Sequence, residues 1–188
     1  MAHIDYFLFP ISPFSYLAGD ELERVAARHK ATITYKPFSL MKIFEATGTP
    51  PPGERHPSRQ AHRLQELMRV AAHKEMPITL QPAHFPTNPV PAMSAIIAAQ
   101  SAGGGDLAGL VQYYLRSCWA DEKDIADDEV VRAGLADCGF DPNLSNSGML
   151  SGSETIERNT QEALERHVFG APTYLVDDQM FWGQDRLT

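Results

Sequence analysis

Hydrophobic and polar positions in the first 37 residues predict a strand, a helix and a second strand. Residues 3–9 form a short apolar and aromatic run that ends at Pro10, which is typical of a buried strand. From Ser12 to about Lys30, apolar residues recur at helical spacing and charged residues occupy the opposite side. Residues 31–37 alternate and are rich in β-branched side chains, which favours a strand. This order predicts a βαβ unit with parallel strands and a right-handed crossover.

The middle of the chain has a helical pattern broken by loops. Residues 47–58 and 81–91 are rich in proline, so we expect them to be irregular. Four segments between and after these loops have an apolar face at helical spacing: Arg59–Lys74, Ala92–Ser101, Leu107–Ala120 and Asp127–Cys138.

The last part of the chain returns to a mixed pattern. Residues 153–168 read as a helix, and residues 174–176 and 180–182 as two strands joined by a tight turn. Residues 183–186 have the composition of a helix start. We therefore expect an α/β, thioredoxin-like fold (βαβ…ββα) that is interrupted by an all-helical insertion domain. The expected boundaries place residues 1–38 and 154–188 in the thioredoxin-like domain and 39–153 in the insertion.

Composition excludes several classes of partner. The net charge of −8 disfavours binding to nucleic acid, whose phosphates would be repelled. No apolar run approaches the roughly 20 residues that cross a bilayer, and the N-terminus has no secretory signal pattern. Cys118 and Cys138 are the only cysteines, and they favour two reduced thiols over a disulfide or a metal site. We expect a cytoplasmic protein with no metal and no membrane partner.

Ser12-Pro13-Phe14-Ser15 has the position and spacing of a Cys-x-x-Cys redox motif, with hydroxyls in place of thiols. This replacement disfavours disulfide exchange and indicates a thiol supplied by another molecule, of which glutathione is the obvious candidate. The Ser12 hydroxyl and the dipole of the following helix would stabilise a thiolate. Ser12 can also be a plain helix cap, since serine followed by proline is a common helix start. A role as an acyl-transfer nucleophile is disfavoured because no Gly-x-Ser-x-Gly elbow surrounds Ser12.

Two segments near the C-terminus complete the candidate site. The Ala171-Pro172 bond lies just before a strand, where a thioredoxin-type fold places a cis proline that faces the first helix. In Trp182-Gly183-Gln184-Asp185, Asp185 can cap a helix or bind the α-ammonium of a γ-glutamyl group. Trp182 is more often a core residue than a ligand contact.

Three separated motifs carry a family resemblance that covers nearly the whole chain. They are Ser-Pro-Phe-Ser-Tyr-Leu-Ala from Ser12, Phe-Gly-Ala-Pro-Thr from Phe169 and Phe-Trp-Gly-Gln-Asp-Arg-Leu from Phe181. The chain resembles 2-hydroxychromene-2-carboxylate isomerases, relatives of kappa-class glutathione transferases. The resemblance also includes residues 84–88 and the segment around Trp119.

The resemblance implies a glutathione-dependent isomerase of naphthalene-type aromatic catabolism. In that reaction the glutathione thiolate adds to the 2-hydroxychromene-2-carboxylate ring, the ring opens, a bond rotates, and elimination of glutathione gives trans-o-hydroxybenzylidenepyruvate. It implies that Ser12 holds and activates the glutathione sulfur and that Asn88 reaches the substrate side. It also implies a homodimer. The other glutathione contacts that it implies are Thr49, Ala171, Pro172, Trp182, Gly183, Gln184 and Asp185.

The chain departs from the family pattern at two places. Thr49 stands where the family often has asparagine, and Phe44 stands where naphthalene-pathway isomerases have a lysine, with Lys42 two positions earlier. The family's final helix is mostly absent from the 188 residues. Two alternatives therefore stay open: a kappa-class-like transferase or peroxidase with another acceptor, and a non-catalytic thioredoxin-fold binding module.

Overall fold

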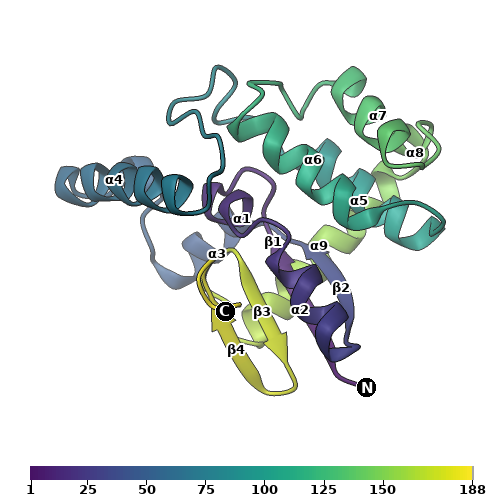
Figure 1. Cartoon of the computed structure of the whole chain (residues 1–188), viewed down its shortest axis with the longest axis horizontal. Helices are drawn as coiled ribbons and strands as arrows, with labels where there is room; N and C mark the ends of the chain where they lie inside the picture. Colours follow the sequence, from purple (N-terminus) through teal and green to yellow (C-terminus); the bar gives the residue numbers. More distant parts are fainter. Residues whose placement is uncertain (188) are drawn as a thin grey trace.

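The computed structural model describes residues 1–187, in which a four-stranded mixed sheet lies between helices (Figure 1). The strand order is β2-β1-β3-β4; β1 and β2 are parallel, whereas β3 pairs antiparallel with both β1 and β4. The predicted strands and the α/β, thioredoxin-like class are therefore confirmed. The strands are β1 (His3–Leu8), β2 (Thr32–Pro37), β3 (Thr173–Val176) and β4 (Gln179–Trp182).

Aromatic side chains fix the register at the centre of the sheet. Tyr6 on β1 lies directly opposite Tyr35 on β2 and Tyr174 on β3. Its ring centroid lies 5.8 Å from that of Tyr35 and 5.0 Å from that of Tyr174. Cross-strand aromatic pairs of this kind stabilise a sheet by about 0.2–1 kcal/mol each.

The single helix predicted after the first strand is wrong, because two helices occupy that segment. Helix α1 (Pro13–Leu17) and helix α2 (Glu21–His29) are separated by a bend at Gly19, whose φ is +62°. Side chains from elsewhere in the chain, Lys74 and Gln112, donate to the backbone carbonyls at this bend. Apolar positions continue on both sides of the bend, so the hydrophobic pattern alone does not reveal it.

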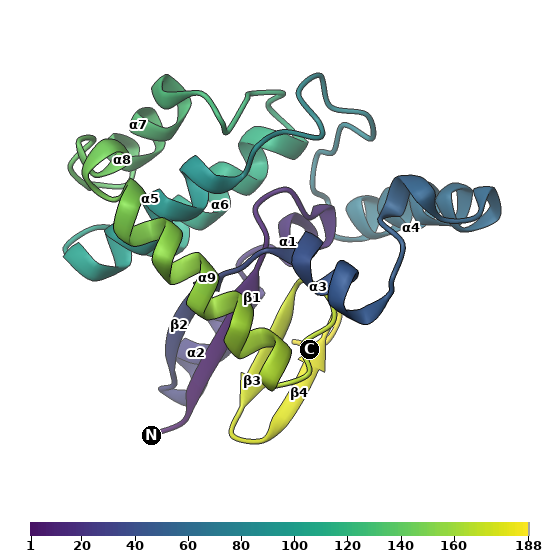
Figure 2. The ribbon, with the colours of Figure 1, turned by 180° about the vertical axis from the view of Figure 1, so that it is seen from behind.

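Helices cover both faces of the sheet. Helix α2 crosses one face, and α9 crosses the opposite face (Figures 1 and 2). In both views α4 extends to one side of the molecule while α5, α6, α7 and α8 gather on the other. The elements between the two halves of the sheet are α3 (Leu40–Thr47), a 3₁₀ turn η1 (Pro52–Glu54), α4 (Pro57–His73), α5 (Val90–Ala102), α6 (Leu107–Trp119), α7 (Asp128–Asp137), α8 (Leu144–Ser147) and α9 (Met149–Glu165).

Two short helices, α3 and α8, were not indicated by the hydrophobic pattern. Helix α3 has recognisable ends, since the Ser39 hydroxyl accepts from the Lys42 amide at 3.4 Å and Gly48 adopts a φ of +67°. Residues 183–186 form a turn and not the predicted helix start.

The buried core continues from the sheet into the middle helices. One cluster of buried side chains joins Tyr6 and Leu17 to Trp119 on α6. Gln100 on α5 also pairs with the backbone of Tyr35, accepting from its amide at 2.8 Å and donating to its carbonyl at 3.0 Å. These bonds satisfy the backbone groups of Tyr35 on the edge strand β2, which would otherwise be unpaired. The division at residues 38 and 154 stays a prediction. No helix within residues 1–187 is long and apolar enough to span a bilayer.

Candidate functional site

The Ser12 side chain links the start of α1 to the segment before β3. Its hydroxyl accepts a hydrogen bond from the Ser15 amide at 3.3 Å and donates one to the Ala171 carbonyl at 3.1 Å. The residue is only 6% exposed. The Ala171–Pro172 peptide bond is cis, as the sequence predicted. Ser12 is therefore both a helix cap and a group that faces the cis-proline segment.

Gly183, in the third sequence motif, extends the row of residues formed by Ser12, Ala171 and Pro172. Its amide donates to the Pro172 carbonyl at 3.0 Å, so the turn after β4 is held against the cis proline. Gly183 has a φ of +118°, and an added Cβ would lie 2.8 Å from the Asp185 carboxylate. Only glycine adopts this conformation without strain. The fold thus brings together residues that are 171 positions apart, from Ser12 to Gly183.

A groove of about 630 Å³ lies beside this row. Five of the predicted glutathione contacts line it: Ala171, Trp182, Gly183, Gln184 and Asp185. The facing wall comes from α4 and the loop before it, which the sequence analysis did not connect with the site. Its members include Arg55, Arg59, His62, Arg63 and Glu66.

Trp182 lies at the wall of the groove and not in the core. Its side chain is 51% exposed and its ring centroid lies 4.9 Å from that of Phe169. Gly170 sits directly beneath the indole, where an added Cβ would approach the Trp182 Nε1 to 2.3 Å. The core interpretation of Trp182 is wrong, because the indole packs on the edge strand and faces the groove.

Three arginines give the facing wall a positive charge. Among the described residues, no carboxylate oxygen lies within 4.0 Å of Arg55, Arg59 or Arg63, whereas Glu66 is paired with Arg69 at 2.6 Å. Burial and the neighbouring Arg55 charge lower the pKa of Arg63, but a guanidinium stays charged at any physiological pH. In a chain of net charge −8, this local positive excess favours an anionic ligand.

The arginine wall was missed because its parts come from a loop and a helix. The available signal was the spacing of Arg59 and Arg63, four residues apart and therefore on one helix face. Arg55 precedes the helix and is held in place by other contacts: its Nε donates to the Pro50 carbonyl at 2.9 Å, and its guanidinium lies 5.4 Å from the Phe44 ring centroid.

The helix that follows Ser12 is shorter than the sequence predicted. Helix α1 has only five residues before the bend at Gly19, and a dipole builds up with the number of aligned peptide units. An anion placed near Ser12 would therefore be stabilised by individual groups, chiefly the Ser12 hydroxyl and the nearby backbone amides.

Other predicted residues do not line the groove; Ser12 and Pro172 are among them, although Phe14 and Ala171 next to them do. The Thr49 hydroxyl lies 3.0 Å from that of Thr47 at the end of α3, and Asn88 accepts from the Val90 amide at 3.1 Å at the start of α5. Lys42 pairs with Glu157 on the surface. Among residues 1–187, no group of three or more His, Cys, Asp or Glu side chains is placed to hold a metal ion.

Known proteins resemble this chain in sequence and in fold. A family model described as a DSBA-like thioredoxin domain matches residues 3–188. A 2-hydroxychromene-2-carboxylate isomerase of Sphingobium xenophagum is 34% identical over 188 residues, which cover 98% of this chain and 93% of that protein. Glutathione S-transferase kappa 1 of Caenorhabditis elegans is 31% identical over 83 residues, 44% of this chain and 36% of that protein.

A solved structure has the same fold. The selenomethionine structure of a 2-hydroxychromene-2-carboxylate isomerase superposes with a TM-score of 0.80 at 24% identity, covering 98% of this chain and 90% of that chain. At this identity the likeness shows the shared fold.

Proposed function

The chain belongs to the DSBA-like thioredoxin domains and, within them, to the 2-hydroxychromene-2-carboxylate isomerases, and from this premise we propose that it is a glutathione-dependent isomerase of that substrate. The observation that carries the proposal is the contact between the buried Ser12 hydroxyl and the Ala171 carbonyl, beside a groove with a basic wall. Neither Cys118 nor Cys138 lines this groove, so the described residues supply no thiol nucleophile there.

The charges of the groove fit glutathione. That tripeptide has two carboxylates and one ammonium group at neutral pH. Arg55, Arg59 and Arg63 supply positive charge along one wall. At the opposite side Asp185 supplies a carboxylate, which lies 3.6 Å from the guanidinium of Arg186. We assign the carboxylates of the ligand to the arginine wall and to backbone amides near Gly183, and its ammonium to Asp185. Opposite charges across a groove favour one orientation of the ligand over the reverse.

Glutathione when bound supplies the thiol that the chain itself lacks at this site. The proposed chemical role of Ser12 is to donate a hydrogen bond from its hydroxyl to the ligand sulfur and thereby stabilise the thiolate. Rotation of that hydroxyl away from Ala171 leaves the Ala171 carbonyl available to accept from the amide of the ligand's cysteinyl residue. A Ser12 oxygen to sulfur distance of about 3–3.5 Å is expected, somewhat longer than for an oxygen acceptor.

The direct test is an assay of 2-hydroxychromene-2-carboxylate turnover with and without glutathione, beside calorimetric titration of the protein with glutathione. We expect turnover only when glutathione is present and binding at micromolar to millimolar concentration. Turnover that is equal in the absence of any thiol would contradict the proposal.

A second candidate function is that of a kappa-like glutathione transferase or peroxidase, favoured by the partial match to the kappa-class transferase. It uses the same thiol site with another acceptor. Assays with 1-chloro-2,4-dinitrobenzene and with hydroperoxides distinguish it from the isomerase. Glutathione binding without turnover of any acceptor would instead indicate a binding module.

We also propose a cytoplasmic homodimer. The two cysteines support a reducing compartment, since Cys118 and Cys138 are both free and no disulfide forms between them. The dimer is supported by the family resemblance alone. Light scattering in solution measures the oligomeric state, and a monomer at micromolar concentration would contradict it.

A further inference from the structure

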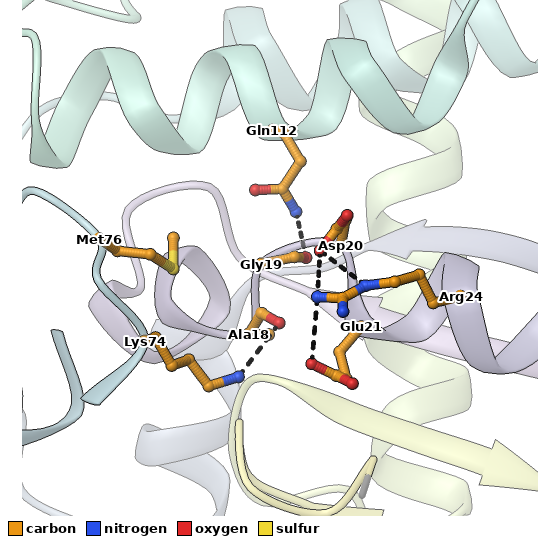
Figure 3. Close-up of a pocket in the computed structure, with 8 residues that line it drawn as sticks. All are labelled: Ala18, Gly19, Asp20, Glu21, Arg24, Lys74, Met76 and Gln112. Atoms are coloured by element: carbon orange, nitrogen blue, oxygen red, sulfur yellow. Dashed lines mark hydrogen bonds and ion pairs between the residues drawn. The ribbon is translucent and has the colours of Figure 1, made fainter. Parts of the chain in front are cut away.

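A second, smaller cavity of about 390 Å³ lies behind the bend between α1 and α2 (Figure 3). Lys74 reaches into it from the end of α4, and Gln112 from α6. The Gln112 amide donates to the Gly19 carbonyl at 2.6 Å. The cavity therefore has donors from two distant helices that are directed at the backbone carbonyls of the bend.

The Lys74 ammonium connects two parts of the backbone. Its Nζ lies 3.5 Å from the Ala18 carbonyl oxygen and 3.5 Å from the Gln184 carbonyl oxygen. Both distances are long for hydrogen bonds, so the interaction is mainly that of a positive charge with two carbonyl dipoles. Within the described residues, no carboxylate oxygen lies within 4.0 Å of this ammonium, which leaves the carbonyls as its partners.

The backbone around Lys74 holds its side chain in this direction. Lys74 ends α4, and its amide donates to the Val70 carbonyl at 2.9 Å. The side chain is half-buried and lines the cavity together with Met76, whose sulfur would lie 3.7 Å from a Cβ added at Gly19. A lysine that is partly removed from water loses side-chain freedom and hydration, and compensation requires polar partners such as these carbonyls.

The two carbonyls belong to the two halves of the proposed glutathione site. Ala18 ends the short helix that begins at Ser12, and a cation at the end of a helix is favourable for its free carbonyls. Gln184 lies in the turn that carries Asp185 and lines the groove. One ammonium group thus joins the helix of the sulfur-binding residue to the turn assigned to the γ-glutamyl group.

We propose that Lys74 is a positioning residue that fixes the Gln184–Asp185 turn relative to α1 and so sets the affinity for the γ-glutamyl end of glutathione. This inference rests on the proposed function. Lys74 does not line the groove itself and acts through the backbone of the turn.

The test compares the binding of two ligands by calorimetric titration: glutathione, and cysteinylglycine, which lacks the γ-glutamyl group. Lys74→Met removes the charge and keeps the length of the side chain, Lys74→Gln keeps a polar end, and Lys74→Arg keeps the charge. Gln112→Leu is the matched control, because it removes the donor to the neighbouring Gly19 carbonyl without touching Gln184. Circular dichroism establishes that each variant is folded before titration.

We expect Lys74→Met and Lys74→Gln to raise the glutathione Kd by roughly 3- to 10-fold and to leave the cysteinylglycine Kd within about 2-fold. Lys74→Arg should restore glutathione binding to within about 2-fold of the wild type. Gln112→Leu should lower the melting temperature with little change in either Kd.

Two results would overturn the inference while the proposed function stands. One is an unchanged glutathione Kd in every folded Lys74 variant. The other is an equal loss of affinity for both ligands, which would indicate general disruption of the groove. Failure of the wild-type protein to bind glutathione would instead overturn the proposed function.

Discussion

The Ser12 hydroxyl donates a hydrogen bond to the carbonyl oxygen of Ala171, at 3.1 Å, although the two residues are 159 positions apart. This bond links the N-terminus of α1 to the cis-proline segment. It gives Ser12 two measurable roles, one in the stability of α1 and one in the proposed chemistry.

Replacing Ser12 by alanine separates these roles. Ser12→Ala removes the cap of α1 and should lower the free energy of unfolding by about 1 kcal/mol. It also removes the donor proposed for the ligand sulfur, so turnover at saturating glutathione should fall by roughly 10²-fold. Thermal unfolding and steady-state kinetics measure the two effects.

Ser15→Ala is the matched control for this change. Ser15 is buried and its hydroxyl has no hydrogen-bond partner among residues 1–187, so its removal should cost little stability and little activity. Equal losses of turnover in both variants would exclude a special role for Ser12.

Gly170→Ala should change the shape of the groove by displacing the Trp182 indole. An alanine Cβ would lie 2.3 Å from the indole nitrogen, so the ring must move away from its present position. We expect weaker glutathione binding and a red shift of the tryptophan fluorescence, since the other tryptophan, Trp119, is buried. Gly53→Ala, which meets no atom within 4 Å, serves as the control and should change neither property. An unshifted spectrum with unchanged affinity in Gly170→Ala would show that the indole does not shape the site.

Arg63→Gln should weaken glutathione binding by about 10-fold or more, because it removes a half-buried charge from the groove wall. The affinity of the wild-type protein should fall as ionic strength rises, and that of the variant should fall less. Arg28→Gln, an exposed change on α2 away from the groove, keeps the net charge of the variant equal and should bind like the wild type. If both variants lose affinity equally, overall charge and not the groove wall determines binding.

Acid stability should depend on Asp5. Burial by itself would raise the pKa of this carboxyl group, but hydrogen bonds and charges from Arg166 and Lys36 outweigh it and hold the pKa below its ordinary value. A depressed folded-state pKa contributes stability above the unfolded pKa of about 3.9, and this stability is lost as the pH falls through the folded value.

Asp5→Asn should therefore lower the free energy of unfolding by about 1–3 kcal/mol at pH 7 and reduce the loss of stability between pH 5 and pH 3. Denaturant unfolding across this range measures both effects. Asp20→Asn breaks an exposed pair with Arg24 and should cost less than about 1 kcal/mol. An acid profile of Asp5→Asn that parallels the wild type would refute the assignment.

Local sequence signals predicted the elements whose stability comes from short-range patterns. The strands of the first 37 residues and the β3–β4 hairpin are present. The cis Ala171–Pro172 bond is also present, but it was predicted from its expected place in a thioredoxin-type fold and not from a local signal. The same reasoning missed α3, whose ends at Ser39 and Gly48 are visible only when caps are sought before periodicity. It also missed the bend at Gly19, because donors from Lys74 and Gln112 satisfy the carbonyls of that bend from distant parts of the chain.

By itself, the sequence determined the class of fold and the three motifs around Ser12, Ala171 and Gly183, because strand patterns, caps and turn residues act over a few positions. Tertiary structure alone decided that these motifs meet, that Arg55 and Arg63 form the facing wall, and that Trp182 is exposed at the groove. It also left Thr49 and Asn88 outside that groove. The physical reason is that hydrogen bonds and charges between residues far apart in sequence depend on how helices and strands pack, which no local pattern records.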